Sequence, residues 1–354
     1  MTTDIGDLLP PLLQSLTALE FIARHLDPMI FEAVMEGVGT PDKALRLARD
    51  KIGDPSNGAQ GGEAQLLAAS DHALAAFDGM RAALAQGDDL YAVFRALRHL
   101  PRALEALYPL ASNVPAVSSF FLVPSLRSDA AALARHAQPA RDGETGVMHF
   151  DNEPGSRGGF SLYVPETYSA GKPLPLVMAL HGGSGNGRGF LWSWLREARS
   201  LDAILVAPTA TGRTWALMGD DADTPNLNRI LDFVHERWRV DPTQLLLTGM
   251  SDGGTFCYVS GLEAQSRFTH LAPVSATFHP LMAQMADADR VRGLPIYLVH
   301  GARDWMFPVE VARSAGQALA AAGANVTYRE LDDLSHCYPR EINADILPWL
   351  AASR

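Results

Sequence analysis

The stretch that decides the fold runs from Leu245 to Gly254 and reads LLLTGMSDGG. Its first half has the apolar pattern of a buried strand, and the segment that follows it, TFCYVSGLEA, is compatible with a helix. Between the two, Gly249, Ser251 and Gly253 form the pattern G-x-S-x-G, which places a serine hydroxyl on a sharp strand-to-helix turn. The flanking glycines leave room for neighbouring backbone, and the first N–H groups of the helix point toward an anion formed beside the serine. The pentapeptide alone is also compatible with a glycine-rich turn that carries an incidental serine.

Length and composition describe a globular chain with room for two domains. The 354 residues exceed the usual size of one domain, and a hydrophobic content of 47% with 19% charged residues is ordinary for a chain that buries a large core. The formal net charge of −11 argues against a nucleic-acid partner, because phosphate binding requires a concentrated basic surface. With only two cysteines, no disulfide framework is indicated and a reducing compartment fits.

The N-terminus and the apolar runs argue against export and against a membrane span. The first segment, MTTDIGDLLPPLLQSL, carries acidic residues where a signal peptide carries lysine or arginine, and two prolines interrupt its apolar run. No stretch approaches the roughly 18 uninterrupted apolar residues of a membrane span. We therefore expect a cytoplasmic protein.

Residues 1–138 have the pattern of an all-helical domain. Leu67, Leu74, Phe77 and Leu84 recur at helical spacing, and no segment alternates as a strand would. Neither a glycine-rich phosphate loop nor a Cys/His metal spacing occurs there. The segment QPARDG, residues 138–143, reads as a linker, so we assign residues 139–354 to a second domain.

After the linker the apolar pattern becomes that of a sheet. Strands alternate with segments of helical length, which predicts an α/β fold: a mostly parallel sheet with helices on both faces, preceded by one antiparallel pair. The expected strands are Val147–Phe150, Gly159–Val164, Leu176–Leu180, Ala203–Val206, Leu245–Leu247, Leu271–Val274, Ile296–Val299 and Val326–Tyr328. In such sheets reactive groups collect at the carboxyl ends of the strands.

A glycine-rich loop follows the strand that ends at Leu180 and reads HGGSG. Such a loop can aim backbone N–H groups at one point, so Gly183, or Ser184, together with the N–H of Asp252, forms a candidate oxyanion hole. His181 stands at the start of this loop. Its position there favours a structural hydrogen-bonding role over that of a catalytic base.

Two further polar side chains follow later strands. Asp304 lies in the turn after Ile296–Val299, and His336 lies in the loop before the last helix. Acyl transfer requires a hydroxyl nucleophile, an imidazole that takes and returns its proton, and a carboxylate that holds the imidazole. Ser251, Asp304 and His336 occur in the chain order typical of such a triad.

Alternatives exist for the acid of this triad. On its own, Asp304 is equally compatible with the N-cap of the helix that follows it. Asp332 and Asp333 lie four and three residues from His336, too close along the chain for either carboxylate to reach behind the ring easily. We therefore favour Asp304.

Bulky apolar residues near the strand ends are candidates for the substrate pocket, although several are equally compatible with the core. These are Phe190, Trp192, Trp215, Met250, Phe278, Trp305 and Phe307. Their bulk favours an apolar or aromatic acyl group.

Four motifs together resemble a serine esterase of the α/β-hydrolase fold, of the phospholipase/carboxylesterase-like and the polyhydroxybutyrate-depolymerase-like or feruloyl-esterase-like branch. They are LHGGSGNG at 180–187, TGMSDGG at 248–254, HGARDWMFP at 300–308 and DLSHCYP at 333–339. The resemblance covers about residues 146–354 and implies a triad of Ser251, Asp304 and His336 that needs neither cofactor nor metal. Secreted depolymerases of that branch carry signal peptides and substrate-binding modules; this chain shows neither, which favours a small soluble ester as substrate.

The leading hypothesis is thus a serine carboxylesterase that hydrolyses a small ester through an acyl-enzyme on Ser251. A serine peptidase or an acyltransferase of the same fold would use the same triad, and a non-catalytic binding protein of this fold is the alternative from another class. The helical domain would be either a lid over the acyl pocket or an oligomerisation module. We favour the module, and hence a homo-oligomer, because lids are more often inserted within the sheet domain.

Overall fold

A computed structural model describes residues 5–52, 61–87 and 90–353. The chain divides into two compact units, Met1–Pro139 and Ala140–Arg354, and each is described by itself. Residues 1–4, which entered the argument against a signal peptide, lie outside the described ranges. No helix in those ranges is long and apolar enough to cross a membrane.

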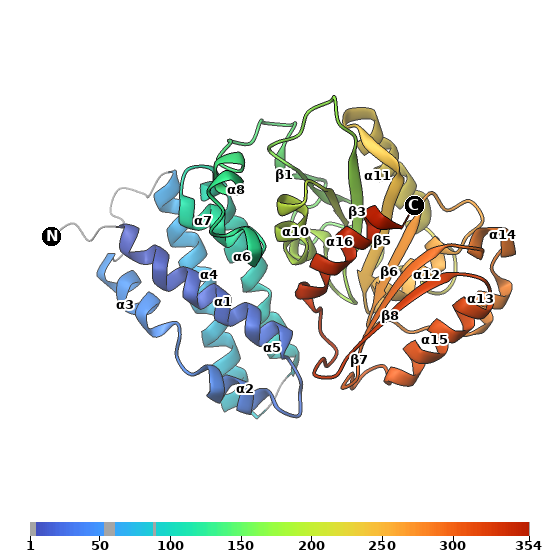
Figure 1. The fold of residues 1–354 in the computed structure, drawn as a ribbon. Coiled ribbons are helices and arrows are strands. Elements are labelled where there is room, and N and C mark those ends of the chain that lie inside the picture. The colour runs from blue at the N-terminus through green and yellow to red at the C-terminus, as the bar shows by residue number, and fades with distance from the viewer. Residues whose placement is uncertain (1–4, 53–60, 88–89, 354) are drawn as a thin grey trace. The chain divides into compact units, whose positions relative to one another are not determined.

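Helices are the regular secondary structure of the first unit in the residues that are described, as predicted (Figure 1). The longest helix, α4, packs against α1, α3, α5 and α6. The predicted apolar stripe of α4 buries Leu67, Leu74 and Phe77, and Gly87 adopts a left-handed φ of 86° just beyond its end. The helices are α1 (Leu9–Arg24), α2 (Phe31–Val38), α3 (Lys43–Ile52), α4 (Gly62–Ala85), α5 (Leu90–Leu97), α6 (His99–Leu107), α7 (Pro115–Phe120) and α8 (Ala130–Arg135).

The second unit is built on an eight-stranded sheet with the order β1-β2-β4-β3-β5-β6-β7-β8. Strand β2 pairs antiparallel with both β1 and β4, and all later pairings are parallel. Each of the eight predicted strands overlaps an observed one, so the mostly parallel sheet and its antiparallel start are confirmed. The strands are β1 (Gly146–Phe150), β2 (Phe160–Val164), β3 (Leu174–Leu180), β4 (Ile204–Pro208), β5 (Val240–Met250), β6 (His270–Val274), β7 (Pro295–Gly301) and β8 (Asn325–Leu331).

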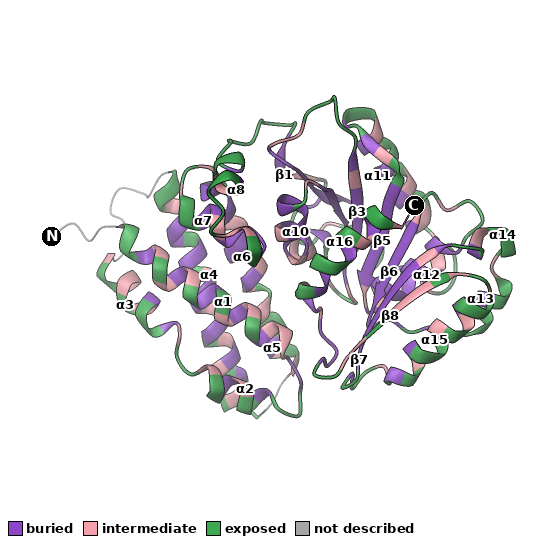
Figure 2. Ribbon diagram, in the orientation of Figure 1, coloured by how far each residue is buried: buried purple, intermediate pink, exposed green. Residues whose placement is uncertain are grey.

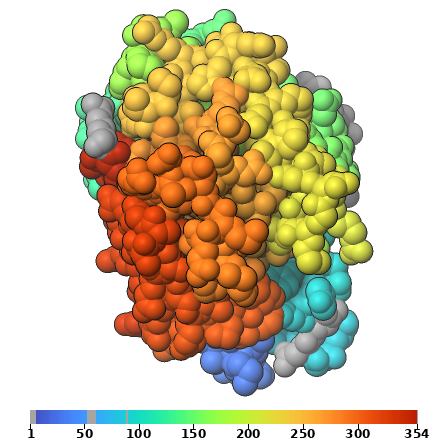
Figure 3. Space-filling model, turned by 90° about the vertical axis from the view of Figure 1, so that its right-hand side faces the viewer, coloured from blue at the N-terminus to red at the C-terminus, as the bar shows by residue number. Residues whose placement is uncertain are grey.

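Helices cover both faces of this sheet, also as predicted. On one face α11, α12 and α15 share a hydrophobic core with alternate residues of the central strands, and on the other α16 packs against α10 and β5. The helices are α9 (Gly187–Phe190), α10 (Leu195–Ser200), α11 (Asp223–Arg237), α12 (Asp252–Gly261), α13 (Leu281–Met285), α14 (Ala288–Val291), α15 (Val309–Ala321) and α16 (Asn343–Ala352). Figure 3 shows residues of the later half of the chain, yellow to red, covering one side of this unit.

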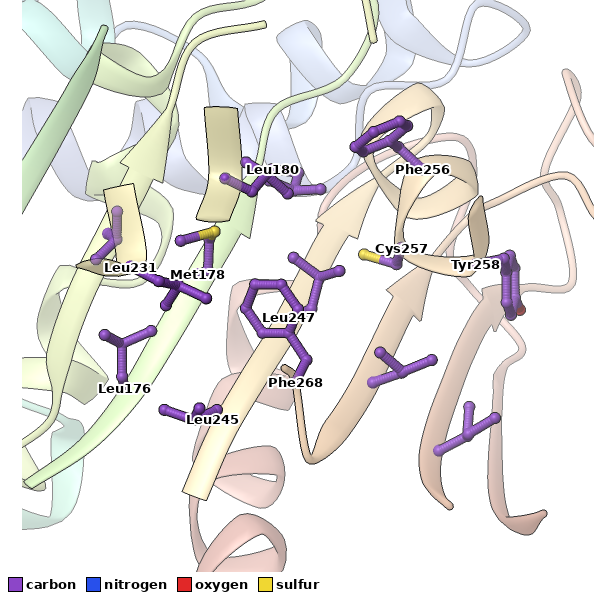
Figure 4. Packing of buried hydrophobic residues seen from close by; sticks show 14 of the residues in the cluster. Leu176, Met178, Leu180, Leu231, Leu245, Leu247, Phe256, Cys257, Tyr258 and Phe268 are labelled. Carbon is purple, nitrogen blue, oxygen red and sulfur yellow. The ribbon is translucent and has the colours of Figure 1, made fainter. Parts of the chain in front are cut away.

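The centre of the sheet is buried on both faces. Strands β3 and β5 run through the core and are buried along most of their length (Figure 2). Leu176, Met178 and Leu180 alternate along β3 and pack with Leu245 and Leu247 of β5 (Figure 4). Fully burying one such side chain contributes roughly 1.5–3 kcal/mol. This packing supports the carboxyl ends of β3 and β5 from both sides of the strand pair.

The backbone turns from β5 into α12 directly against the end of β3, and small residues allow this approach. A Cβ on Gly253 would lie 2.5 Å from the carbonyl oxygens of both Leu180 and His181. A Cβ on Gly249 would lie 2.6 Å from the backbone of Gly253. The two glycines that flank the serine in sequence are therefore required by packing, as the motif predicts.

We expect Gly253→Ala to lower the free energy of unfolding by about 1–3 kcal/mol or more, because the added methyl group meets backbone that cannot rotate away. The matched control is Gly316→Ala inside α15, where the nearest atom would be a side-chain carbon of Val326 at 4.0 Å. That control should gain up to about 1 kcal/mol, since alanine favours helix. Urea unfolding of both variants is the measurement; equal midpoints for the two would contradict the packing argument.

Candidate active site

Ser251 occupies the turn between β5 and α12 in a strained backbone conformation. Its φ and ψ are 56° and −119°, in a region that residues with a side chain rarely adopt. Its N–H donates to the carbonyl of Val274 at 3.0 Å, and its own carbonyl accepts from Thr255 at 2.8 Å. These bonds hold the strained turn in place and leave the hydroxyl at the carboxyl end of the sheet.

The structure brings the three predicted triad side chains into one hydrogen-bonded row. The Nε2 atom of His336 lies 3.0 Å from Oγ of Ser251, although the two residues are 85 positions apart. The Nδ1 atom of His336 lies 2.8 Å from Oδ2 and 3.0 Å from Oδ1 of Asp304. An ionised carboxylate only accepts, so the proton of the neutral ring is on Nδ1 and Nε2 is free to accept the serine proton.

Asp304 is held for this role by its own turn. It does not cap α15, whose N-cap position is Pro308; instead its Oδ1 accepts from the N–H groups of Met306 at 2.9 Å and Phe307 at 2.8 Å. Burial opposes ionisation, but the hydrogen bonds from His336 and Phe307 outweigh it and hold the pKa of Asp304 below its ordinary value. The competing acids Asp332 and Asp333 are exposed to solvent.

The glycine-rich loop after β3 lies against the start of α12. A Cβ on Gly183 would be 2.8 Å from Oδ2 of Asp252, and one on Gly182 would be 3.6 Å from the Cβ of Ser251. Asp252 is the first residue of α12, where backbone N–H groups lack partners within the helix. Gly183 thus lies beside the side chain of Asp252, and the oxyanion hole formed by the N–H groups of these two residues stays a prediction. Ser184, the other candidate, is exposed and has a φ of 56°.

The side chain of Asp252 has a role that the sequence did not predict. Its Oδ2 accepts a hydrogen bond from the hydroxyl of Thr214 at 2.5 Å. Thr214 lies in the loop after β4, so this bond ties that loop to the residue after the nucleophile. No local sequence signal marks the threonine, because the contact joins segments 38 positions apart.

His181 has a structural environment. Its Nδ1 lies 2.7 Å from the carbonyl of Gly182 and its Nε2 accepts from the N–H of Ala210 at 3.1 Å. Burial lowers the pKa of this imidazole to about 4, so the ring is neutral at physiological pH. Both ring nitrogens are used by backbone groups, which agrees with the structural role favoured from the sequence.

The candidate pocket residues separate into two groups. Trp215 and Phe278 belong to the hydrophobic core, where Trp215 stacks on Phe256 and Phe278 packs on Tyr258. For both residues the structure thus agrees with a place in the core, which the sequence also allowed.

Beside the triad, Trp305 and Phe307 meet the ring of His336 edge-on, with centroids 6.2 and 5.2 Å away, and Trp305 is 43% exposed. Phe190 packs on Tyr338, Trp192 is buried, and Met250 is half-buried. Trp305 and Phe307 are therefore the candidates in contact with the triad.

Within the described ranges, no group of three or more His, Cys, Asp or Glu side chains is arranged to hold a metal ion. Both cysteines are buried and neither forms a disulfide; Cys257 lies inside α12, and Cys337 follows His336 in the chain.

Comparisons with known proteins concern the second unit. A family model described as Phospholipase/Carboxylesterase matches residues 221–353, a stretch that includes Ser251, Asp304 and His336. This part of the chain is thus similar to that family. A probable feruloyl esterase C from Aspergillus oryzae is 28% identical over 123 residues, which are 33% of this chain and 45% of that protein. Feruloyl esterase C from Emericella nidulans is 24% identical over 159 residues, 43% of this chain and 56% of that protein. The chain thus spans about half the length of the curated relatives it matches.

Solved structures agree on the fold. A structure titled ferulic acid esterase superposes with a TM-score of 0.50 at 16% identity, covering 59% of this chain and 97% of that one. At this identity the likeness speaks for the fold alone. Together with the sheet order and the nucleophile turn, it identifies the second unit as an α/β-hydrolase fold.

Proposed function

We propose that the second unit is a serine carboxylesterase with Ser251 as nucleophile, His336 as general base and acid, and Asp304 as the carboxylate that orients His336. One observation carries the proposal: the hydrogen-bonded row from Ser251 through His336 to Asp304, set on a strained turn. A strained turn costs on the order of 1–3 kcal/mol. A serine with a merely structural role would require neither this strain nor the hydrogen-bonded row. The naming of relatives as feruloyl esterases supports the same reaction class.

The proposed reaction has two halves. As Oγ of Ser251 attacks the ester carbonyl, Nε2 of His336 takes the hydroxyl proton, and the N–H groups of Gly183 and Asp252 stabilise the oxyanion. The alcohol leaves with the proton from His336, and an acyl-enzyme remains. Water then attacks the acyl carbon while the same imidazole takes its proton, and Ser251 leaves as the free hydroxyl. Ser184 is the alternative second oxyanion donor.

We propose a small ester with an apolar or aromatic acyl group as the substrate. Trp305 and Phe307 present aromatic surface beside His336, so an acyl group bound there would lie against apolar rings. The half-buried side chains of Phe190 and Met250 would extend this surface. The word feruloyl in the names of the relatives denotes an aromatic acyl group, which favours the aromatic members of the class.

We expect Ser251→Ala to lower kcat/KM for p-nitrophenyl acetate by about 10⁴-fold or more, because no other hydroxyl is hydrogen-bonded to His336 Nε2 in the described ranges. The matched control is Ser260→Ala, a buried serine on α12, the helix that follows Ser251. It should keep wild-type kinetics. Wild-type turnover in the Ser251 variant would refute the assignment, and a wild type that turns over no ester or amide would favour a binding protein.

For the first unit we propose an oligomerisation role. Its described surface carries several exposed large apolar side chains, among them Phe21, Leu47 and Tyr91, and Tyr91 is 77% exposed. Contiguous apolar surface marks sites of association, and Phe21 lines a surface hollow together with Leu13, Ala18 and Val38.

Sedimentation equilibrium of the full chain and of a chain lacking residues 1–138 tests this role. We expect the full chain to form a homo-oligomer and the shortened chain to be a monomer, since the associating surface is removed. Unchanged subunit number with an altered ester preference would indicate a lid instead.

A further inference from the structure

Asp304 faces a second imidazole besides that of His336. His300 lies near the end of β7 and is buried, and its Nε2 atom is 3.4 Å from Oδ2 of Asp304. The same Nε2 atom is 2.9 Å from the backbone carbonyl oxygen of Phe307. His300 therefore touches the triad carboxylate and the turn that carries it at one point.

The contact with Phe307 decides which ring nitrogen of His300 carries the proton. A carbonyl oxygen only accepts, so Nε2 must bear a hydrogen, and this hydrogen is directed at the Phe307 carbonyl with Oδ2 of Asp304 beside it. Oδ1 of Asp304 is already occupied by the N–H groups of Met306 and Phe307. The N–H of His300 thus donates to the Phe307 carbonyl, while its Nε2 lies 3.4 Å from Oδ2 of Asp304, close enough for the N–H dipole to act on the carboxylate.

The same bond closes the turn of Asp304 from its other side. Asp304 holds the N–H of Phe307, while His300 holds the carbonyl of Phe307. Because His300 belongs to β7, which pairs with β6 and β8, the turn is anchored to the sheet through this imidazole. Displacement of the Phe307 backbone, whose N–H binds the Asp304 carboxylate, would require this bond to break.

The surroundings of His300 keep the ring neutral. Burial lowers its pKa most, and the proximity of His336 adds to this, while the Phe307 carbonyl, Asp304 and Glu330 act in the opposite direction. Glu330 comes from the facing strand β8, where it pairs with His300, and its carboxylate is bound by Arg313 at 2.6 Å and by Tyr328 at 2.8 Å. A neutral His300 leaves His336 as the imidazole that changes charge during the reaction.

We propose that His300 is a positioning residue of the active site, whose Nε2–H holds the Asp304 turn and weakens the attraction of the Asp304 carboxylate for the proton on His336. The inference rests on the proposed function, since it assigns Asp304 its effect through His336. It adds a fourth side chain to the row of three.

The experiment compares His300→Leu with His300→Gln in the full chain. Leucine removes the N–H, so the carboxylate attracts the imidazolium of His336 more strongly and the turn loosens. We expect kcat for p-nitrophenyl acetate to fall about 10- to 100-fold, less than the roughly 10⁴-fold loss of a missing triad carboxylate, with KM within about threefold of wild type. We also expect the acidic limb of kcat/KM to move to higher pH by up to about one unit. Glutamine carries an N–H group at a similar distance from the backbone. His300→Gln should therefore restore most of the wild-type kcat and most of the wild-type position of the acidic limb.

The matched control is His270→Leu. His270 is also buried on a strand of the same sheet, and its Nε2 lies 3.0 Å from the carbonyl of Ser353, away from the triad. This variant should lose stability without moving the acidic limb. The inference is overturned if His300→Leu keeps the wild-type kcat and the wild-type acidic limb of kcat/KM. It is also overturned if His300→Gln behaves as the leucine variant does.

Imidazole NMR separates this result from a failure of the proposed function. The titration of His336, followed in wild type and in His300→Leu, requires no turnover, and the pKa of His336 should be higher in the variant. An inactive wild type with this shift would refute the esterase but keep the role of His300. An active wild type without this shift would keep the esterase but refute the role of His300.

Discussion

The structure depends on the close approach of the β5–α12 turn to the end of β3. Gly249 and Gly253 allow backbone to meet backbone there, and Ser251 takes the strained conformation that results. Strained backbone persists where the surrounding structure holds it, and the buried leucines of β3 and β5 pack beneath this turn. Any side chain at Gly253 would displace the Leu180 and His181 carbonyls and with them the loop that begins at His181. The same backbone contacts therefore determine both the packing of the core and the position of the Ser251 hydroxyl.

A parallel sheet then assembles the site from distant segments. The loops after β3, β5, β7 and β8 all begin at the same edge, so residues 32 and 85 positions apart reach hydrogen-bonding distance. Two of the triad members are held by bonds outside the triad: Ser251 by Val274, and Asp304 by Met306 and Phe307. His300 extends this support from β7 to the carboxylate itself. The reactive row is rigid because its supports are backbone groups of the sheet and its turns.

The sequence predicted the parts of this arrangement that local patterns encode. Apolar runs located all eight strands, and G-x-S-x-G located the turn, because strand pattern and glycine spacing are properties of neighbouring residues. The partners of Thr214 and His300 escaped prediction, since both contacts depend on how loops from different strands meet. Trp215 and Phe278 lie near strand ends as expected, yet bulk alone does not distinguish a pocket wall from the core that they join.

The most direct test of Ser251 as an activated nucleophile is covalent labelling of the native full chain with diethyl 4-nitrophenyl phosphate, followed by peptide mapping. Attack by an activated serine on the phosphorus leaves a stable phosphoryl ester that mass spectrometry localises to one residue. The account predicts stoichiometric labelling of Ser251, and loss of that labelling in His336→Ala. Labelling of a different serine, or equal labelling of Ser251 without the imidazole, would contradict it.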